Sequence, residues 1–213
     1  MSATRIVSFS LVAFVLILVP GPSVLFVVGR ALSLGRRSAL LSVLGNAAGE
    51  YVQVVAVAVG IGTLIERSVA LLSVVRLAGA AYLVFLGVRA VLRRAEIAAG
   101  ALQGARAVPS RSRIVRDGLV VGATNPKTLA FFLAVLPGFV DPAAGPTSLQ
   151  LLVLGLVWVA IALLSDSAWA LAAGLARTWL GRSPRRLEAM GAAGGTAMIG
   201  LGVYLAVSRQ KAG

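Results

Sequence analysis

Six apolar runs, separated by polar segments, dominate the 213-residue sequence and restrict what it can fold into. Each run is close to the length of about 20 residues that an α-helix needs to cross the hydrocarbon core of a bilayer. Because the bilayer core offers no water to the backbone, such segments must satisfy their hydrogen bonds internally. The sequence therefore predicts an all-α polytopic membrane protein with six transmembrane helices, within residues 6–28, 39–62, 69–92, 118–140, 149–176 and 189–207.

The charges predict an orientation in the bilayer. Only 13% of the residues are charged, and the net charge is +13. Fourteen cations follow the first, third and fifth runs: Arg30, Arg36, Arg37, Arg89, Arg93, Arg94, Arg106, Arg111, Arg113, Arg116, Arg177, Arg182, Arg185 and Arg186. The opposite side has five: Arg5, Arg67, Arg76, Arg209 and Lys211. The positive-inside rule places the richer side in the cytoplasm and both termini outside. Basic loops placed in this way face lipid, so nucleic-acid binding is the weaker interpretation.

Cysteine and histidine are both absent from the sequence. This excludes disulfides and thiolate metal sites and removes the commonest general base, and no enzyme motif occurs. We therefore expect neither a cofactor nor a metal site. The first apolar run continues through Pro20 and Pro22 without a cleavage site of small residues, which predicts a retained span and not a signal peptide.

The two halves of the chain share several features. Residues 79–88 resemble residues 194–203, prolines interrupt spans one and four, and spans two and five each carry an acid. Three spans per half would place the halves in opposite orientations, as in the inverted repeats of secondary transporters. We expect one membrane domain, 1–213, with repeats 1–92 and 118–213 around a basic cytoplasmic loop, 93–117. Chance similarity between glycine-rich helices is the alternative explanation.

The prolines mark predicted helix starts inside the membrane. Pro22, after Pro20 and Gly21, and Pro126, after Asn125, each remove a backbone donor and fit the first position of a helix. A helix start carries free N–H groups and the positive end of the helix dipole, so it attracts anions such as a carboxylate. The alternative is a packing kink without a ligand.

Two acids are predicted within spans. Asn46, Glu50 and Gln53 follow the helical spacing that lines one face, and Asp166 lies in span five. Charges at this depth cost several kcal/mol, roughly 2.5 to 3.5 for Asp or Lys, so they persist mainly with a partner or a function. Each acid could hold a substrate ammonium or take up a proton. Lys127 could instead pair with one of them, which would leave at least one acid free.

Other features favour packing. Trp158 and Trp169 are expected to pack or anchor their helix. Small-xxx-small pairs let helices approach closely, either within one bundle or between the subunits of a homodimer. These pairs are Gly45 with Gly49, Gly118 with Gly122, and Gly191 with Gly195.

Several of these motifs resemble the LysE/RhtB amino-acid exporter family. They are Pro20-Gly21-Pro22 in span one, residues 45–50 in span two, residues 79–87 in span three, and Asn125-Pro126-Lys127 followed by residues 131–140 in span four. The resemblance covers essentially the whole chain, and the motif of span four is its most specific part. This family often has Gln before the phenylalanine that closes span four, whereas this chain has Gly138, so the resemblance indicates no individual relative.

The resemblance implies export of amino acids or close derivatives across the bacterial inner membrane, driven by protons. It also carries over Glu50 and Asp166 as polar-site residues. With the residue analysis, it predicts a zwitterion whose carboxylate lies toward Pro22 and Pro126 and whose ammonium lies toward Glu50 or Asp166. Three alternatives stay open: an exporter of hard cations, a membrane scaffold without transport, and an intramembrane enzyme, for which catalytic groups are not apparent.

Overall fold

The computed structural model describes residues 1–65, 69–102, 109–176 and 183–207, and within these ranges the chain forms helices and no strand. The α-helices are α1 (Ala3–Leu18), α2 (Pro22–Leu34), α3 (Arg36–Ile65), α4 (Val69–Leu92), α5 (Arg94–Leu102), α6 (Arg111–Ala123), α7 (Pro126–Ala134), α8 (Thr147–Leu175) and α10 (Pro184–Val207). Two short 3-10 helices, η1 (Leu136–Phe139) and η2 (Pro142–Ala144), connect α7 to α8.

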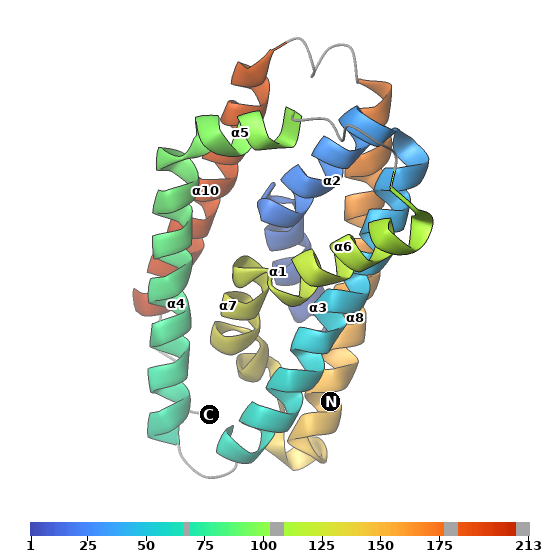
Figure 1. Cartoon of the computed structure of the whole chain (residues 1–213). Coiled ribbons are helices and arrows are strands. Elements are labelled where there is room, and N and C mark those ends of the chain that lie inside the picture. The colour runs from blue at the N-terminus through green and yellow to red at the C-terminus, as the bar shows by residue number, and fades with distance from the viewer. Residues whose placement is uncertain (66–68, 103–108, 177–182, 208–213) are drawn as a thin grey trace.

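The helices form an elongated bundle (Figure 1). Helices α4 and α10 pack together along one edge, and α3 and α8 pack together along the other. Helices α1, α2 and α7 lie between these two pairs, and α5 crosses one end of the bundle. Helices α2 and α7 therefore begin between these two pairs, at Pro22, which is exposed, and at Pro126, which is partly buried.

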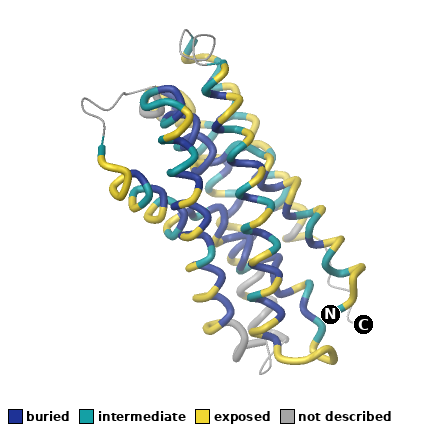
Figure 2. The backbone as a smooth tube through the Cα atoms, turned by 90° about the vertical axis from the view of Figure 1, so that its right-hand side faces the viewer, coloured by how far each residue is buried: buried dark blue, intermediate teal, exposed yellow. Residues whose placement is uncertain are grey.

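Among the residues that the structure describes, two helices, α3 over Arg36–Gly60 and α8, are long and apolar enough to cross a membrane. Helices α1 and α2, bent by 51° at the break between them, make a third if they count as one span. Large apolar side chains lie on the outer surface, such as Val59 at 71% and Leu164 at 76% exposure. Figure 2 shows exposed residues along the outer faces and buried residues through the middle, an arrangement suited to lipid.

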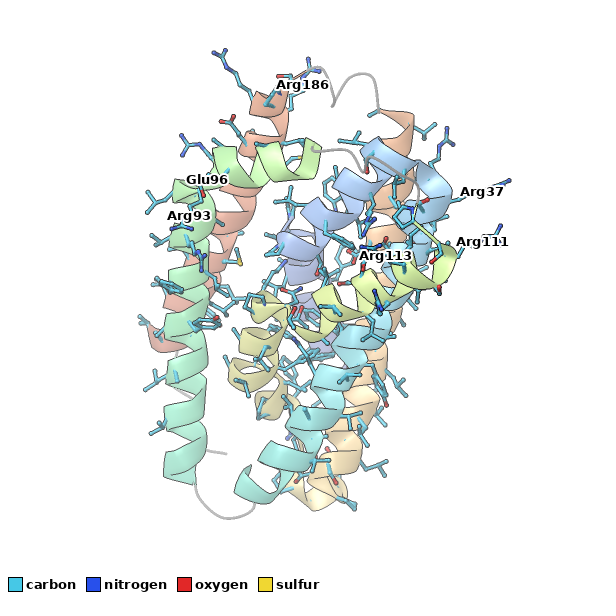
Figure 3. All side chains as sticks on the ribbon, in the orientation of Figure 1. Arg37, Arg93, Glu96, Arg111, Arg113 and Arg186 are labelled. Atoms are coloured by element: carbon cyan, nitrogen blue, oxygen red, sulfur yellow. The ribbon has the colours of Figure 1, made fainter. Side chains whose placement is uncertain are left out.

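The N-terminus and the labelled arginines lie toward opposite ends of the bundle. The N-terminal mark lies at the end of the bundle away from α5 (Figure 1). Figure 2 gives the burial along the same backbone. Arg37, Arg93, Arg111, Arg113 and Arg186 lie toward the other end, where α5 crosses (Figure 3). Six cations of the predicted charge pattern lie outside the described residues: Arg67, Arg106, Arg177, Arg182, Arg209 and Lys211.

The segment 93–117, predicted as a basic loop, contains helix on both sides of residues 103–108, which the structure does not describe. Helix α5 occupies its first part, and α6 begins at Arg111. Ala95, Ala98 and Ala99 give α5 strong helix formers. Ser110 caps α6 by accepting a hydrogen bond from the backbone N–H of Arg113 at 3.4 Å.

Close packing at the paired glycines is confirmed for the α3–α6 contact. A Cβ added at Gly45 or Gly49 would collide with the backbone of α6, and one at Gly118 or Gly122 would collide with the backbone of α3. Gly195 likewise packs against the backbone of Gly87 on α4, within the two segments that resemble each other in sequence. The prediction is wrong for Gly191, because the nearest atoms to a Cβ there lie 3.9 Å away.

Candidate functional site

Two helices begin at the predicted prolines, between the outer helix pairs. Helix α1 ends at Leu18, and α2 begins at Pro22 with Gly21 as its N-cap. Helix α6 ends at Ala123, and α7 begins at Pro126. Asn125 caps α7, since its Oδ1 accepts a hydrogen bond from the N–H of Lys127 at 3.1 Å. Proline suits the first position because that position has no intrahelical use for an N–H.

A buried chain of hydrogen bonds links the two helix starts. The Asn125 side chain donates from Nδ2 to the Ser23 hydroxyl at 2.6 Å. Ser23, the second residue of α2, donates in turn to Oδ1 of Asn46 on α3 at 3.1 Å. The three side chains are at most 6% exposed, so few competing water contacts are available to them.

The same chain reaches both buried acids. Nδ2 of Asn46 donates to Glu50 Oε1 and to Asp166 Oδ2, each at 3.2 Å. Trp158 donates from Nε1 to the other oxygen of Glu50, Oε2, at 2.8 Å. Thr128 of α7 adds a longer hydrogen bond of 3.4 Å to Glu50 Oε1. Both acids are 3% exposed; Glu50 belongs to α3, the helix of Asn46, and Asp166 belongs to α8.

Lys127 makes a different contact from the one considered in the sequence analysis. Its Nζ donates to the backbone carbonyls of Leu16 and Val19, each at 2.7 Å, and no ion pair joins it to an acid within the described residues. These carbonyls lie at the end of α1, where the proline break leaves them without intrahelical partners. Lys127 therefore caps the end of α1 instead of pairing with Glu50 or Asp166.

Gln53 makes hydrogen bonds at the other helix break, between α6 and α7. Its Nε2 donates to the carbonyls of Ala123 and Asn125, at 2.9 and 3.1 Å, where α6 ends. Its Oε1 is buried and has no hydrogen-bond partner among the described residues. The polar face predicted for α3 thus serves two purposes: Asn46 and Glu50 belong to the acid cluster, and Gln53 supports the helix break.

We expect Gln53→Met to destabilise the protein by about 1–3 kcal/mol, because it removes the side-chain donor of the Ala123 carbonyl and one of the two donors of the Asn125 carbonyl, which keeps the N–H of Leu129. Loss of the unpaired Oε1 would offset part of this cost. Thermal unfolding of the purified protein in detergent would measure the change. Val52→Met is the matched control, since Val52 precedes Gln53 on α3 and is 54% exposed. Equal melting temperatures of the two variants would contradict the capping role.

All nine residues singled out from the sequence lie in or beside this region: Pro20, Gly21, Pro22, Asn46, Glu50, Asn125, Pro126, Lys127 and Asp166. Sequence reasoning missed Ser23 and Thr128, and it assigned Trp158 to packing. The positions of Ser23 and Thr128, within the first turn of a helix that starts with proline, carried a usable signal. The hydrogen bond from Trp158 to Glu50 had no such signal in the sequence, since the two residues lie 108 positions apart.

Two cavities meet at this region. A cavity of about 20 Å³ is lined by Glu50, Asp166 and Trp158, among others, and has room for about one water molecule. A second, of about 700 Å³, which we call the chamber, lies between α2, α4 and α10. Gly21 and Lys127 line both cavities and therefore form the wall between them. The acids line only the small cavity.

The arrangement offers opposite charges on the two sides of one wall. The ammonium of Lys127 has three N–H donors, of which the contacts with the described residues use two. A carboxylate can approach it together with the start of α2, where the helix dipole favours negative charge. An ammonium group suits the small cavity, which contains two carboxylates. The site thus presents groups suited to both ends of a zwitterion.

Comparison with known proteins identifies the family. The profile of the family described as LysE type translocator matches residues 14–209. A homoserine/homoserine lactone efflux protein of Salmonella typhimurium is 30% identical over 95% of this chain and 96% of its own length. An uncharacterized membrane protein of Vibrio cholerae is 32% identical over 95% of this chain and 96% of its own.

A leucine efflux protein of Enterobacter sp. is 32% identical over 67% of this chain and 66% of its own length. No solved structure matches the chain. The described helices, the apolar outer surface and the profile match over most of the sequence agree with one another. The chain is therefore a member of the LysE type translocator family of membrane transporters.

Proposed function

We propose that the protein exports amino acids or close derivatives across the bacterial inner membrane in exchange for protons. The observation that carries this proposal is the buried hydrogen-bond chain, in which Asn125, Ser23 and Asn46 link both helix starts to Glu50 and Asp166. The efflux activity in the names of two relatives supports it.

In the proposed binding mode, the substrate lies across the wall between the two cavities. Its carboxylate faces Lys127 and the start of α2, and its ammonium reaches the small cavity of Glu50 and Asp166. The substrate needs Lys127 and Gly21 to shift, because they separate the cavities in this conformation. Pro20, Gly21, Pro22 and Pro126 then form the substrate's surroundings on the chamber side.

Coupling follows from the charge of the acids. An ionised carboxylate holds an ammonium strongly in a water-poor site, whereas a protonated one holds it weakly. Proton uptake from outside by Glu50 or Asp166 would release the substrate there. Loss of that proton to the cytoplasm would restore the binding site for the next substrate.

Transport by the wild-type protein tests this proposal directly. Proteoliposomes are loaded with one radiolabelled amino acid at a time, and efflux is followed with and without a proton gradient. We expect efflux that accelerates when the outside is acidified and slows when a protonophore removes the gradient. Absence of flux for every amino acid would contradict the export function, and flux that ignores the gradient would contradict the coupling.

We further propose six membrane spans in an inverted three-plus-three repeat, with α1–α2 and α6–α7 as the broken first spans. The break before Pro22 and the break before Pro126 support this arrangement, as do the acids on α3 and α8. The labelled arginines lie at the end of the bundle away from the N-terminus, which supports the proposal of a cytoplasmic arginine-rich end and external termini (Figures 1 and 3).

The orientation can be tested by cysteine labelling, because the chain has no cysteine of its own. Ser148 and Ser112 are both exposed, and they start α8 and α6. In intact spheroplasts, a membrane-impermeant maleimide is expected to label Ser148→Cys and to label Ser112→Cys only after the membrane is opened. The reverse pattern would invert the proposed orientation, and labelling of both would contradict the span count.

A further inference from the structure

The chamber has a lining that the proposed head-group site does not explain. Its volume of about 700 Å³ lies within the range of roughly 300–1,000 Å³ typical of pockets that enclose drug-sized ligands. An amino-acid head group at the wall of Gly21 and Lys127 would fill only a small part of it. The rest of the chamber is available to the side chain of the amino acid.

The walls differ along the length of the chamber. Near Gly21 they consist of Pro20, Pro22 and Pro126, and the middle is apolar, with Leu25, Phe26, Leu86 and Met198. Polar groups other than Lys127 belong to residues farther along α2, α4 and α5, namely Arg30, Ser33, Arg89, Arg93 and Glu96. Arg93 and Glu96 lie at the arginine-rich end (Figure 3).

Arg30 is occupied by other contacts. It pairs with Asp117 at 2.6 Å and lies over the ring of Phe26, with 5.1 Å from its guanidinium carbon to the ring centroid. The Ser33 hydroxyl donates to the carbonyl of Gly29 at 2.8 Å, and Arg89, Arg93 and Glu96 lie farther from the head-group end. In the part of the chamber next to the head group, a polar side chain would therefore lose its water contacts against prolines, leucines and methionine without gaining a partner. An apolar side chain would gain from leaving water.

From these walls we infer that the chamber is a side-chain pocket selective for amino acids with large apolar side chains, aromatic or long aliphatic. This inference rests on the proposed function, since it places the head group at the wall of Gly21 and Lys127. Single methylene differences in apolar pockets change selectivity by about 10-fold or more. Leucine and phenylalanine are therefore expected to be preferred over alanine by at least about tenfold.

Gly191 on α10 offers a way to fill the chamber without disturbing the bundle. It lines the chamber, and a Cβ there lies 3.9 Å from Arg94 Cβ and from Leu25 Cδ1, which is ordinary contact. Gly200, on the same helix, is exposed, does not line the chamber and has no atom within 4 Å of an added Cβ. Gly191→Leu and Gly200→Leu therefore make a matched pair.

The test compares efflux of alanine, leucine, phenylalanine and tryptophan from proteoliposomes containing the wild type or one of three variants. Gly191→Leu is expected to reduce phenylalanine and tryptophan efflux about tenfold relative to alanine efflux, and Gly200→Leu should keep the wild-type pattern. Leu86→Ala, which enlarges the chamber, should raise tryptophan efflux relative to leucine. Melting temperatures in detergent confirm that each variant is folded.

The outcomes separate this inference from the proposed function. Lack of efflux of any amino acid by the wild type contradicts the proposed function. Efflux without preference for large apolar side chains, or a Gly191→Leu variant that slows all four substrates equally, overturns the side-chain pocket and leaves export intact. If mass spectrometry shows that Gly191→Leu only displaces a bound phospholipid and the selectivity is unchanged, the chamber holds lipid and the inference is also overturned.

Discussion

Replacing both buried acids by their amides, Glu50→Gln together with Asp166→Asn, is expected to reduce proton-driven efflux to the level of protein-free liposomes. The amides keep the size of the side chains, and each retains one oxygen that can accept a hydrogen bond from Asn46. The amide that replaces Glu50 cannot also accept from Trp158, which bonds the other oxygen of Glu50, so this one hydrogen bond is lost. They cannot carry a negative charge or take up a proton under transport conditions. The substitution therefore removes the ammonium partner and the coupling group and leaves the packing in place.

The single variants would show which acid couples to protons. Nδ2 of Asn46 lies 3.2 Å from an oxygen of each acid, so both acids are close to one another and repel when both are ionised. Removal of the coupling acid should abolish the dependence on the proton gradient and also weaken binding, because a neutral amide holds an ammonium weakly. Removal of the other acid should keep that dependence.

Asp141→Asn is the control for charge removal outside the cluster. Asp141 lies 3.8 Å from Arg5, and its side chain is 30% exposed. It should retain wild-type transport, apart from a small effect of the exposed ion pair on stability. If the double amide variant transports at the wild-type rate with its proton dependence intact, the proposed mechanism is wrong.

Gly122→Val is expected to cause the largest loss of stability, about 3 kcal/mol, at the upper end of the usual cost of overpacking. The added Cβ would meet the backbone of Asn46, which cannot move aside in the way a flexible side chain can. Helices α3 and α6 would have to separate, and Asn46 would move away from Ser23 and both acids. Transport should therefore fail together with stability.

Gly200→Val provides the comparison for this substitution, because Gly200 is a helical glycine whose added Cβ meets nothing within 4 Å. Melting temperatures measured in the same detergent, together with efflux rates, should separate the variants clearly. Equal stability of Gly122→Val and Gly200→Val would show that the contact between α3 and α6 is looser than in this structure.

Part of the site follows from local sequence. The spacing of Asn46, Glu50 and Gln53 places them on one face of any α-helix, and all three are buried here. Pro22 and Pro126 begin helices because proline is tolerated at the first position and disruptive farther along. The shared helix face and the proline helix starts depend only on the geometry of a single helix, so they can be predicted without knowledge of the tertiary fold.

The hydrogen-bond partners of Lys127 could not be predicted from the local sequence. An unpaired lysine near two acids favours an ion pair, yet its Nζ bonds carbonyls of Leu16 and Val19, more than 100 residues earlier in the sequence. The break that frees these carbonyls was visible in the sequence. The position of that break relative to α7 depends on how the helices pack, which single-helix patterns do not specify.

The sequence by itself determined the membrane class, the helical character and the residues at which two helices restart. Each of these depends on hydrogen bonds within one segment, which lipid makes obligatory. Only the tertiary structure decided that Lys127 caps α1, that Ser23 joins Asn125 to Asn46, and that the wall of Gly21 and Lys127 divides the acids from the chamber. These contacts join segments far apart in the chain, and their positions follow from the close approach of helix backbones at glycines such as Gly122.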